Sequence, residues 1–151
     1  MRLLSIMVSA AAVAALLPPV AAADRVYHSE HLRLTPMNGA PLRSGFVENI
    51  KAEGPVVYAH EIFVLNGARA RTTYTVTRNF FPGDPKCYGT VVFPSDVATL
   101  TTNVRGNARG DVFVRPAEVA GFEGVHGVRW TVRDASGAVA YRTRCTAVTL
   151  D

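Results

Sequence analysis

Cysteine is scarce in this chain of 151 residues, which contains only Cys87 and Cys145. The two are far apart, so the chain lacks the closely spaced pair that redox-active dithiols use, and it has too few thiols for a cysteine-rich zinc site. No apolar run of spanning length follows the first 23 residues. We therefore expect a mature protein without a membrane span and without a thiol-based catalytic centre.

Residues 1–23 are typical of a secretory signal peptide, since an apolar run at 3–17 is followed by a proline pair and then by three alanines. A spanning helix needs about 20 apolar residues, and a proline pair would break one here. We expect cleavage before residue 24 and an exported protein, secreted or periplasmic. The mature chain, residues 24–151, is short enough for one domain, and its net charge falls from +4 to +3 because only Arg2 is lost.

Export determines the oxidation state that we expect for the two cysteines. In an oxidising compartment an even pair in a small domain usually forms a disulfide, and two cysteines allow one intramolecular pairing. Cys87 and Cys145 lie 58 residues apart, a loop whose closure stabilises a fold by roughly 4 kcal/mol in the chain-entropy model. We predict a structural Cys87–Cys145 disulfide.

Apolar residues alternate with polar ones along the mature chain, and turn residues interrupt the alternation every eight to twelve positions. This pattern predicts an all-β fold, a single antiparallel β-sandwich of the immunoglobulin-like, Greek-key type with seven to nine strands. A short helical turn is expected at residues 116–121, between a proline suited to a first helical position and a terminal glycine. The expected strands cover residues 31–35, 44–52, 56–65, 71–79, 87–93, 99–103, 111–115, 128–133 and 139–148.

The last expected hairpin, residues 128–148, has the clearest alternation. If residues 139–148 form one continuous strand, Trp130, Cys145 and Ala147 face the core together. The opposite face then carries four arginines, and a strand at 71–79 beside it would add threonines to that face. These arginines are Arg129, Arg133, Arg142 and Arg144.

Residues 99–114, with the sequence TLTTNVRGNARGDVFV, resemble a T-x-T-N/D-x-x-G-x-A hairpin of bacterial immunoglobulin-like sandwich modules. The GVRWTV segment at residues 127–132 resembles the penultimate strand of such modules, and the similarity covers residues 56–150. It implies their architecture but no particular activity, because these modules share none. The chain departs from a true immunoglobulin domain in two ways: its tryptophan lies in the penultimate strand, and its cysteines do not join the two strands that such a domain bridges.

Histidine is the residue type that raises the question of a metal. His28 and His31 lie three positions apart around Glu30, but positions i and i+3 of a strand point to opposite faces. His60 and His126 have no partner at ligand spacing. We interpret His28 and His31 as solvated side chains and expect no metal or other cofactor; a transition-metal site at these two residues is the alternative.

The motifs of nucleophilic catalysis are missing. The chain has no G-x-S-x-G, and most acidic residues stand at turns, where they bond the local backbone. Glu61 is the exception, because it lies in the middle of an apolar strand. It marks a bulge, a sheet edge or a buried partner for an arginine, and a hydrolase or isomerase would need a pocket around it. We expect no enzyme.

The hairpin arginines give the remaining indication of function, since guanidinium groups bind carboxylate, sulfate and phosphate groups well. Two readings are open: a solvated outer face that prevents aggregation, or a face that binds an anionic partner such as an acidic glycan or an envelope protein. Export argues against nucleic acid as the partner. We expect a non-enzymatic binding or envelope-associated module, with a small metal- or ligand-binding protein using the His28/His31 segment as the alternative.

Overall fold

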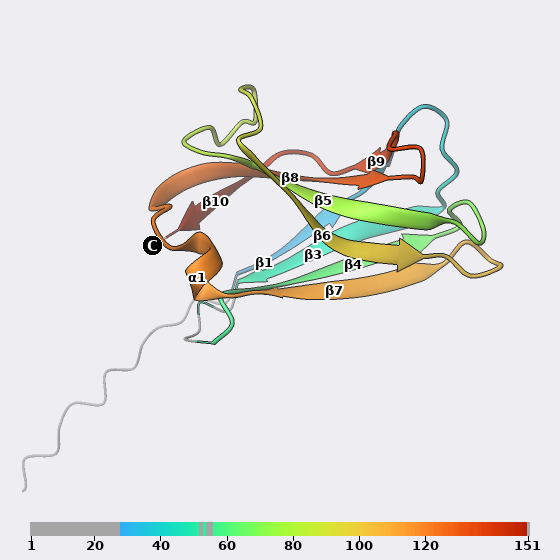
Figure 1. Cartoon of the computed structure of the whole chain (residues 1–151), viewed down its shortest axis with the longest axis horizontal. Helices are drawn as coiled ribbons and strands as arrows, with labels where there is room; N and C mark the ends of the chain where they lie inside the picture. The colour runs from blue at the N-terminus through green and yellow to red at the C-terminus, as the bar shows by residue number, and fades with distance from the viewer. Residues whose placement is uncertain (1–27, 52, 54–55, 151) are drawn as a thin grey trace, which may run out of the picture.

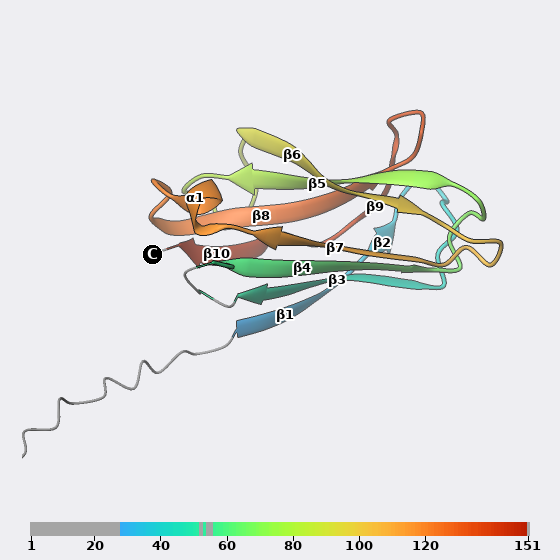
Figure 2. The same ribbon diagram turned by 60° about the horizontal axis from the view of Figure 1, so that its bottom comes forward.

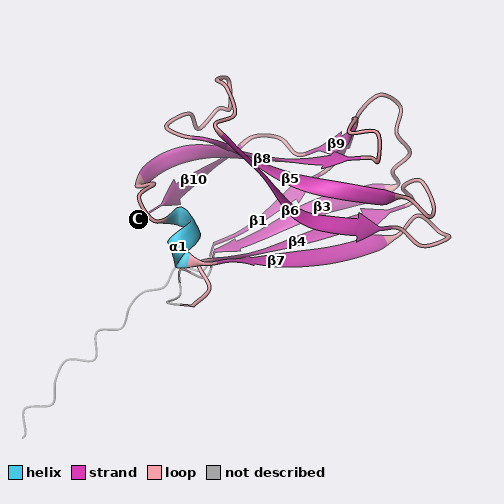
Figure 3. Ribbon diagram, in the orientation of Figure 1, coloured by secondary structure: helices cyan, strands magenta, loops and turns pink. Residues whose placement is uncertain are grey.

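The computed structural model describes residues 28–51, 53 and 56–150, so the predicted signal peptide lies outside the described part. The chain forms ten strands and one short helix there (Figures 1 and 3). These elements are β1 (His28–Arg33), β2 (Thr35–Pro36), β3 (Ser44–Lys51), β4 (Ala59–Asn66), β5 (Thr73–Phe81), β6 (Phe93–Thr101), β7 (Ala108–Val114), α1 (Pro116–Val119), β8 (Gly124–Arg133), β9 (Val139–Arg142) and β10 (Thr146–Leu150).

The strands form two antiparallel sheets that pack face to face, which confirms the predicted β-sandwich (Figure 2). Sheet A has the order β1-β3-β4-β7. Sheet B has the order β2-β9-β8-β5-β6, and β10 pairs with the first half of β8. The edge strands β6 and β7 contact each other along one side of the sandwich. The helix α1 lies at one end of the sandwich, between the end of β7 and the start of β8 (Figure 1).

Strict alternation explains which residues fill the space between the sheets. Every second residue of β4 is buried, and β8 buries Trp130 and Val132 in the same way. Residues that point to one face of a strand recur with period two, so each strand supplies one apolar face to the core. The largest fully buried side chains include Trp130, Tyr141, Phe63, Leu32 and Leu34.

The strand predicted at residues 87–93 is wrong, because a loop connects Phe81 to Phe93. The Asp84 carboxylate accepts hydrogen bonds from the backbone N–H groups of Lys86 (3.1 Å) and Gly89 (2.7 Å), so the loop satisfies its own backbone. Strand β6 begins at Phe93 instead and runs through Pro94. A proline is tolerated there because β6 is the edge strand of sheet B.

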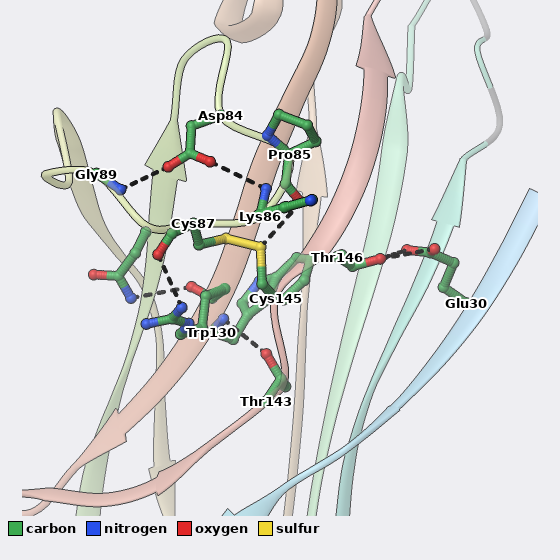
Figure 4. The surroundings of a disulfide bond; sticks show 12 residues. Glu30, Asp84, Pro85, Lys86, Cys87, Gly89, Trp130, Thr143, Cys145 and Thr146 are labelled. Carbon is green, nitrogen blue, oxygen red and sulfur yellow. Dashed lines mark hydrogen bonds between the residues drawn. A yellow bond between two sulfur atoms is a disulfide. The ribbon is translucent and has the colours of Figure 1, made fainter.

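The predicted Cys87–Cys145 disulfide is confirmed, with the two Cα atoms 5.9 Å apart, but the expected core position of Cys145 is wrong (Figure 4). The predicted final strand is interrupted, because β9 ends at Arg142. The hydroxyl oxygen of Thr143 accepts a hydrogen bond from the backbone N–H of Trp130, and the backbone N–H of Thr143 donates one to the carbonyl oxygen of Trp130. When pairing resumes, Thr146 lies opposite the buried Val128. Thr146 therefore points inward, and its neighbours Cys145 and Ala147 point outward.

The disulfide fastens the loop at residues 82–92 over the outer face of β8. A Cβ atom on Gly127 would collide with the backbone oxygen of Asp84 and would lie 2.8 Å from the Cys87 sulfur. At Gly127 the loop backbone therefore packs so close to the sheet that a side chain does not fit between them.

Substituting Gly127→Ala is expected to lower the free energy of unfolding by about 3 kcal/mol, since the added methyl group must displace the loop. Urea denaturation measures this loss. Val125→Ala is the control because Val125 lies two residues earlier on β8 and is 50% exposed. Equal denaturation midpoints for the two variants would contradict the close packing of the loop on Gly127.

Candidate functional site

A cavity of about 310 Å³ lies between the two sheets at the end of the sandwich that carries α1. Strands β3, β4 and β7 line it from sheet A, while β5, β6, β8 and β10 line it from sheet B. Most of the lining side chains are apolar, and several polar or charged ones interrupt them. The apolar walls include Phe80, Phe122, Val128, Val148 and Leu150, and the polar or charged groups are Asn49, Lys51, Glu61, Arg78, Ser95 and Glu118.

Glu61 is the centre of the polar cluster and is only 2% exposed. Its Oε1 accepts a hydrogen bond from Nη1 of Arg78 at 2.9 Å, and its Oε2 accepts one from Nε1 of Trp130 at 3.0 Å. Arg78 and Trp130 lie directly opposite each other in the β5–β8 register, so they form a cross-strand pair on one face of sheet B. Sheet B therefore donates two hydrogen bonds to one carboxylate of sheet A, which fixes that carboxylate as a charged acceptor beside the cavity.

Asn49 is the second polar group from sheet A. It lies opposite Glu61 in the β3–β4 register, and the residue is 5% exposed. Its carboxamide forms no hydrogen bond with any of the described residues, although it lines the cavity. No buried side-chain nitrogen or oxygen atom of the described residues lacks a hydrogen-bond partner, so the atoms of this carboxamide are open to the cavity, where a molecule could use both its donor and its acceptor.

The opening of the cavity carries aromatic and charged side chains. Phe80, Phe93 and Phe122 form a cluster in which Phe122 packs edge-on against both of the others, with ring centroids 5.2 and 5.3 Å apart. Phe93 is 48% exposed, so the cluster reaches from the cavity wall to the surface. Glu118 of α1 lies beside it, with Oε2 at 3.6 Å from Nη2 of Arg78.

Local sequence rules place Glu118 at this position. Pro116 is the first residue of α1, where its missing N–H costs nothing. Glu118 stands in the first turn, and its Oε1 accepts a hydrogen bond at 3.0 Å from the backbone N–H of Arg115. The second oxygen of the carboxylate is left to face Arg78. The predicted helical turn is therefore confirmed, and it also supplies a charge to the cavity.

Among the interpretations of Glu61, the structure confirms the buried partner for an arginine. Arg78 and Asn49 were not among the residues predicted to form a site. The alternation of Tyr74, Val76, Arg78 and Phe80 carried a signal for Arg78, since it puts a guanidinium on an apolar strand face. For Asn49 the local signal was absent, because only the register with β4 reveals its neighbour.

The predicted arginine face is largely present on the outer face of sheet B. Arg129, Arg133 and Arg142 share this face through the β5–β8 and β8–β9 registers, and Thr75 and Thr77 of β5 extend it. Arg144 is exposed in the segment between β9 and β10. Two of the guanidinium groups donate to backbone carbonyl oxygens of their own chain, Arg129 to that of Cys87 at 3.3 Å and Arg133 to that of Gly137 at 3.2 Å.

The structure does not gather the histidines into a metal site within the described residues, where no three His, Cys, Asp or Glu side chains lie close enough to share an ion. His31 Nδ1 lies 2.8 Å from a Glu48 oxygen, and the imidazole packs on Phe46. The hydroxyl of Ser29 and then the imidazole of His31 hold the pKa of the Glu48 carboxyl below its ordinary value. The side chain of His28 lies outside the described part, so the alternative of a metal site at His28 and His31 is untested.

Comparison with protein-family models, with curated proteins and with solved structures found no match to this chain. The function must therefore be argued from the cavity and the surface themselves.

Proposed function

We propose that this protein is an exported, non-enzymatic binding module that holds a small, largely apolar molecule in the cavity between its sheets. One observation carries the proposal: the ion pair between Glu61 and Arg78 lies beside a largely apolar cavity, together with an Asn49 carboxamide that forms no hydrogen bond with the described residues. Ligand sites in proteins commonly combine apolar walls with a few fixed polar groups, in volumes of about 300–1,000 Å³.

The energetics of burial support a role beyond stability. A buried ion pair often contributes no more than apolar side chains of the same volume, because both charges lose their hydration. Sheet A nevertheless places Glu61 in an apolar strand, and sheet B places Arg78 and Trp130 opposite it. Both Glu61 oxygens accept hydrogen bonds, from Arg78 and from Trp130, which holds the carboxylate in one position beside the cavity.

One further feature supports export. The Cys87–Cys145 disulfide is of the kind that persists in oxidising compartments, which agrees with the expected signal peptide at residues 1–23. In the described part of the chain, no helix has the length and apolar character that crossing a bilayer requires.

The cavity can be tested by filling it. Val119 of α1 lines the cavity, so Val119→Trp should obstruct it. We expect the unmodified protein to bind the neutral apolar fluorophore N-phenyl-1-naphthylamine and Val119→Trp to bind it at least about tenfold more weakly, a change of 1.4 kcal/mol. Fluorescence titration measures both affinities.

Val125→Trp is the matched control, since it adds the same indole on the exposed outer side of β8, away from the cavity. Its affinity for the fluorophore should stay within about twofold of the unmodified protein. Equal affinities for all three proteins, or no binding to any, would contradict a ligand site in the cavity.

The outer face of sheet B supports a second candidate function, the binding of an anionic partner such as an acidic glycan. The specific observation is that Arg133 and Arg142 share a face with the hydroxyls of β5. Replacing Arg133, Arg142 and Arg144 by serine should lower the salt concentration of elution from heparin more than replacing Arg33, Arg43 and Arg105, which are also exposed. Equal elution of the two triple variants would leave the arginine face as ordinary surface.

A further inference from the structure

The charged side chains that line the cavity are two cations, Arg78 and Lys51, and two carboxylates, Glu61 and Glu118. Arg78 lies between both carboxylates, 2.9 Å from Glu61 and 3.6 Å from Glu118. Lys51 bonds the carbonyl oxygen of Thr149 and lies 3.8 Å from Glu53, a carboxylate outside the lining. Each cation is thus already paired, and with Glu53 included three carboxylates contact the two cations.

A row of polar side chains also crosses the inner face of sheet A. Asn49 lies opposite Glu30 of β1 on one side and opposite Glu61 of β4 on the other. Glu30 accepts a hydrogen bond from the Thr146 hydroxyl at 2.8 Å. The Asn49 carboxamide, which forms no hydrogen bond with the described residues, therefore stands between two carboxylates, and both of these neighbouring side chains are hydrogen-bond acceptors.

We infer that the ligand is an amphiphile whose polar end donates hydrogen bonds. An alkylammonium should bind more tightly than an alkanol, and both should bind more tightly than a carboxylate. This inference rests on the proposed function, since it describes the occupant of the same cavity. The donor end lies at the Asn49 carbonyl oxygen and Glu61, and the apolar body lies against the aromatic and aliphatic walls. Because three carboxylates, Glu61, Glu118 and Glu53, contact the two cations Arg78 and Lys51, an ammonium gains a net Coulomb attraction and a carboxylate a net repulsion, and the low-dielectric walls strengthen both.

The experiment uses Trp130, the only tryptophan of the chain, whose indole lines the cavity and bonds Glu61. Its emission reports binding directly. The mature protein is titrated at pH 7 and low salt with three probes that share one chain length: octylammonium, octan-1-ol and octanoate. We expect octylammonium to bind at least about tenfold more tightly than octanoate, with octan-1-ol between them.

Two variants identify the groups responsible for this order. Glu118→Gln keeps the side-chain oxygen near Arg115 but removes one charge, so it should reduce the preference for octylammonium over octanoate by at least about threefold. Glu123→Gln removes an exposed charge that does not line the cavity and should leave the preference unchanged. Asn49→Leu should weaken octan-1-ol about tenfold while N-phenyl-1-naphthylamine still binds, because only the polar end of a ligand needs the carboxamide.

The outcomes separate the two proposals. Octanoate that binds as tightly as octylammonium, while the neutral fluorophore also binds, overturns the inferred ligand class and leaves the cavity a binding site. Absence of binding for all three amphiphiles and for the fluorophore overturns both. The ranked order, with its loss in Glu118→Gln and its retention in Glu123→Gln, supports both.

Discussion

Replacing both Cys87 and Cys145 by serine is expected to lower the free energy of unfolding by about 4 kcal/mol. The disulfide closes a loop of 58 residues, and its removal returns that loop's conformational freedom to the unfolded chain. It also holds the loop at residues 82–92 against β8, where Gly127, which has no side chain, leaves room for the loop backbone. Urea unfolding followed by tryptophan emission measures the loss.

The unmodified protein in excess dithiothreitol is the control, because reduction removes the same covalent bond without changing the sequence. The reduced protein and the serine variant should unfold at the same urea concentration. A loss below about 1 kcal/mol in both would show that the bond contributes little to the fold and would weaken the argument for an oxidising compartment.

Substituting Glu61→Ala is expected to cost about 3 kcal/mol of stability, the second large effect. The substitution leaves Arg78 with only the more distant Glu118 and leaves the Trp130 Nε1–H without its acceptor. The Glu61 side chain is 3% exposed, so water cannot readily replace the carboxylate. Glu123→Ala, which removes an exposed acid, should cost less than about 0.5 kcal/mol.

A double-mutant cycle with Arg78→Ala tests the cause. The double variant should be more stable than the sum of the two losses predicts, by about 1.5 kcal/mol or more, because the unpaired buried charge is then removed as well. Additive losses would mean that Glu61 and Arg78 contribute independently and that the ion pair is not the organising contact of the cavity.

The sandwich could be predicted because its strands have one face in the core and one face toward solvent. In β4 each second residue is buried, and in β8 the apolar Val128, Trp130 and Val132 are buried at alternate positions; this alternation is visible in the sequence as period two. The break between β9 and β10 could not be predicted, because it depends on Thr143 bonding the backbone of Trp130 thirteen residues away. A break of this kind changes the sheet face on which each later residue lies. Cys145 and Ala147 were predicted to face the core and instead face outward.

The candidate site shows the same division between local and distant causes. Glu61 stood out because a charged residue in an apolar strand is a local anomaly. Asn49 did not stand out, because its place in the site follows only from the strand register that puts it opposite Glu61. The role of Arg78 follows only from its hydrogen bond to Glu61 of the other sheet. The cavity itself is formed by residues distributed from β3 to β10, and no stretch of sequence alone encodes its presence.

The central claim is that a ligand lies between the sheets at the α1 end. The most direct measurement is a ¹H–¹⁵N NMR titration of the mature protein with octylammonium, with the Asn49 carboxamide and the Trp130 indole N–H as reporters. We predict saturable shifts at both, while the arginine N–H groups of the outer face, such as those of Arg142, stay unchanged. Shifts confined to that outer face, or no saturable shift at Asn49 and Trp130, would contradict the account.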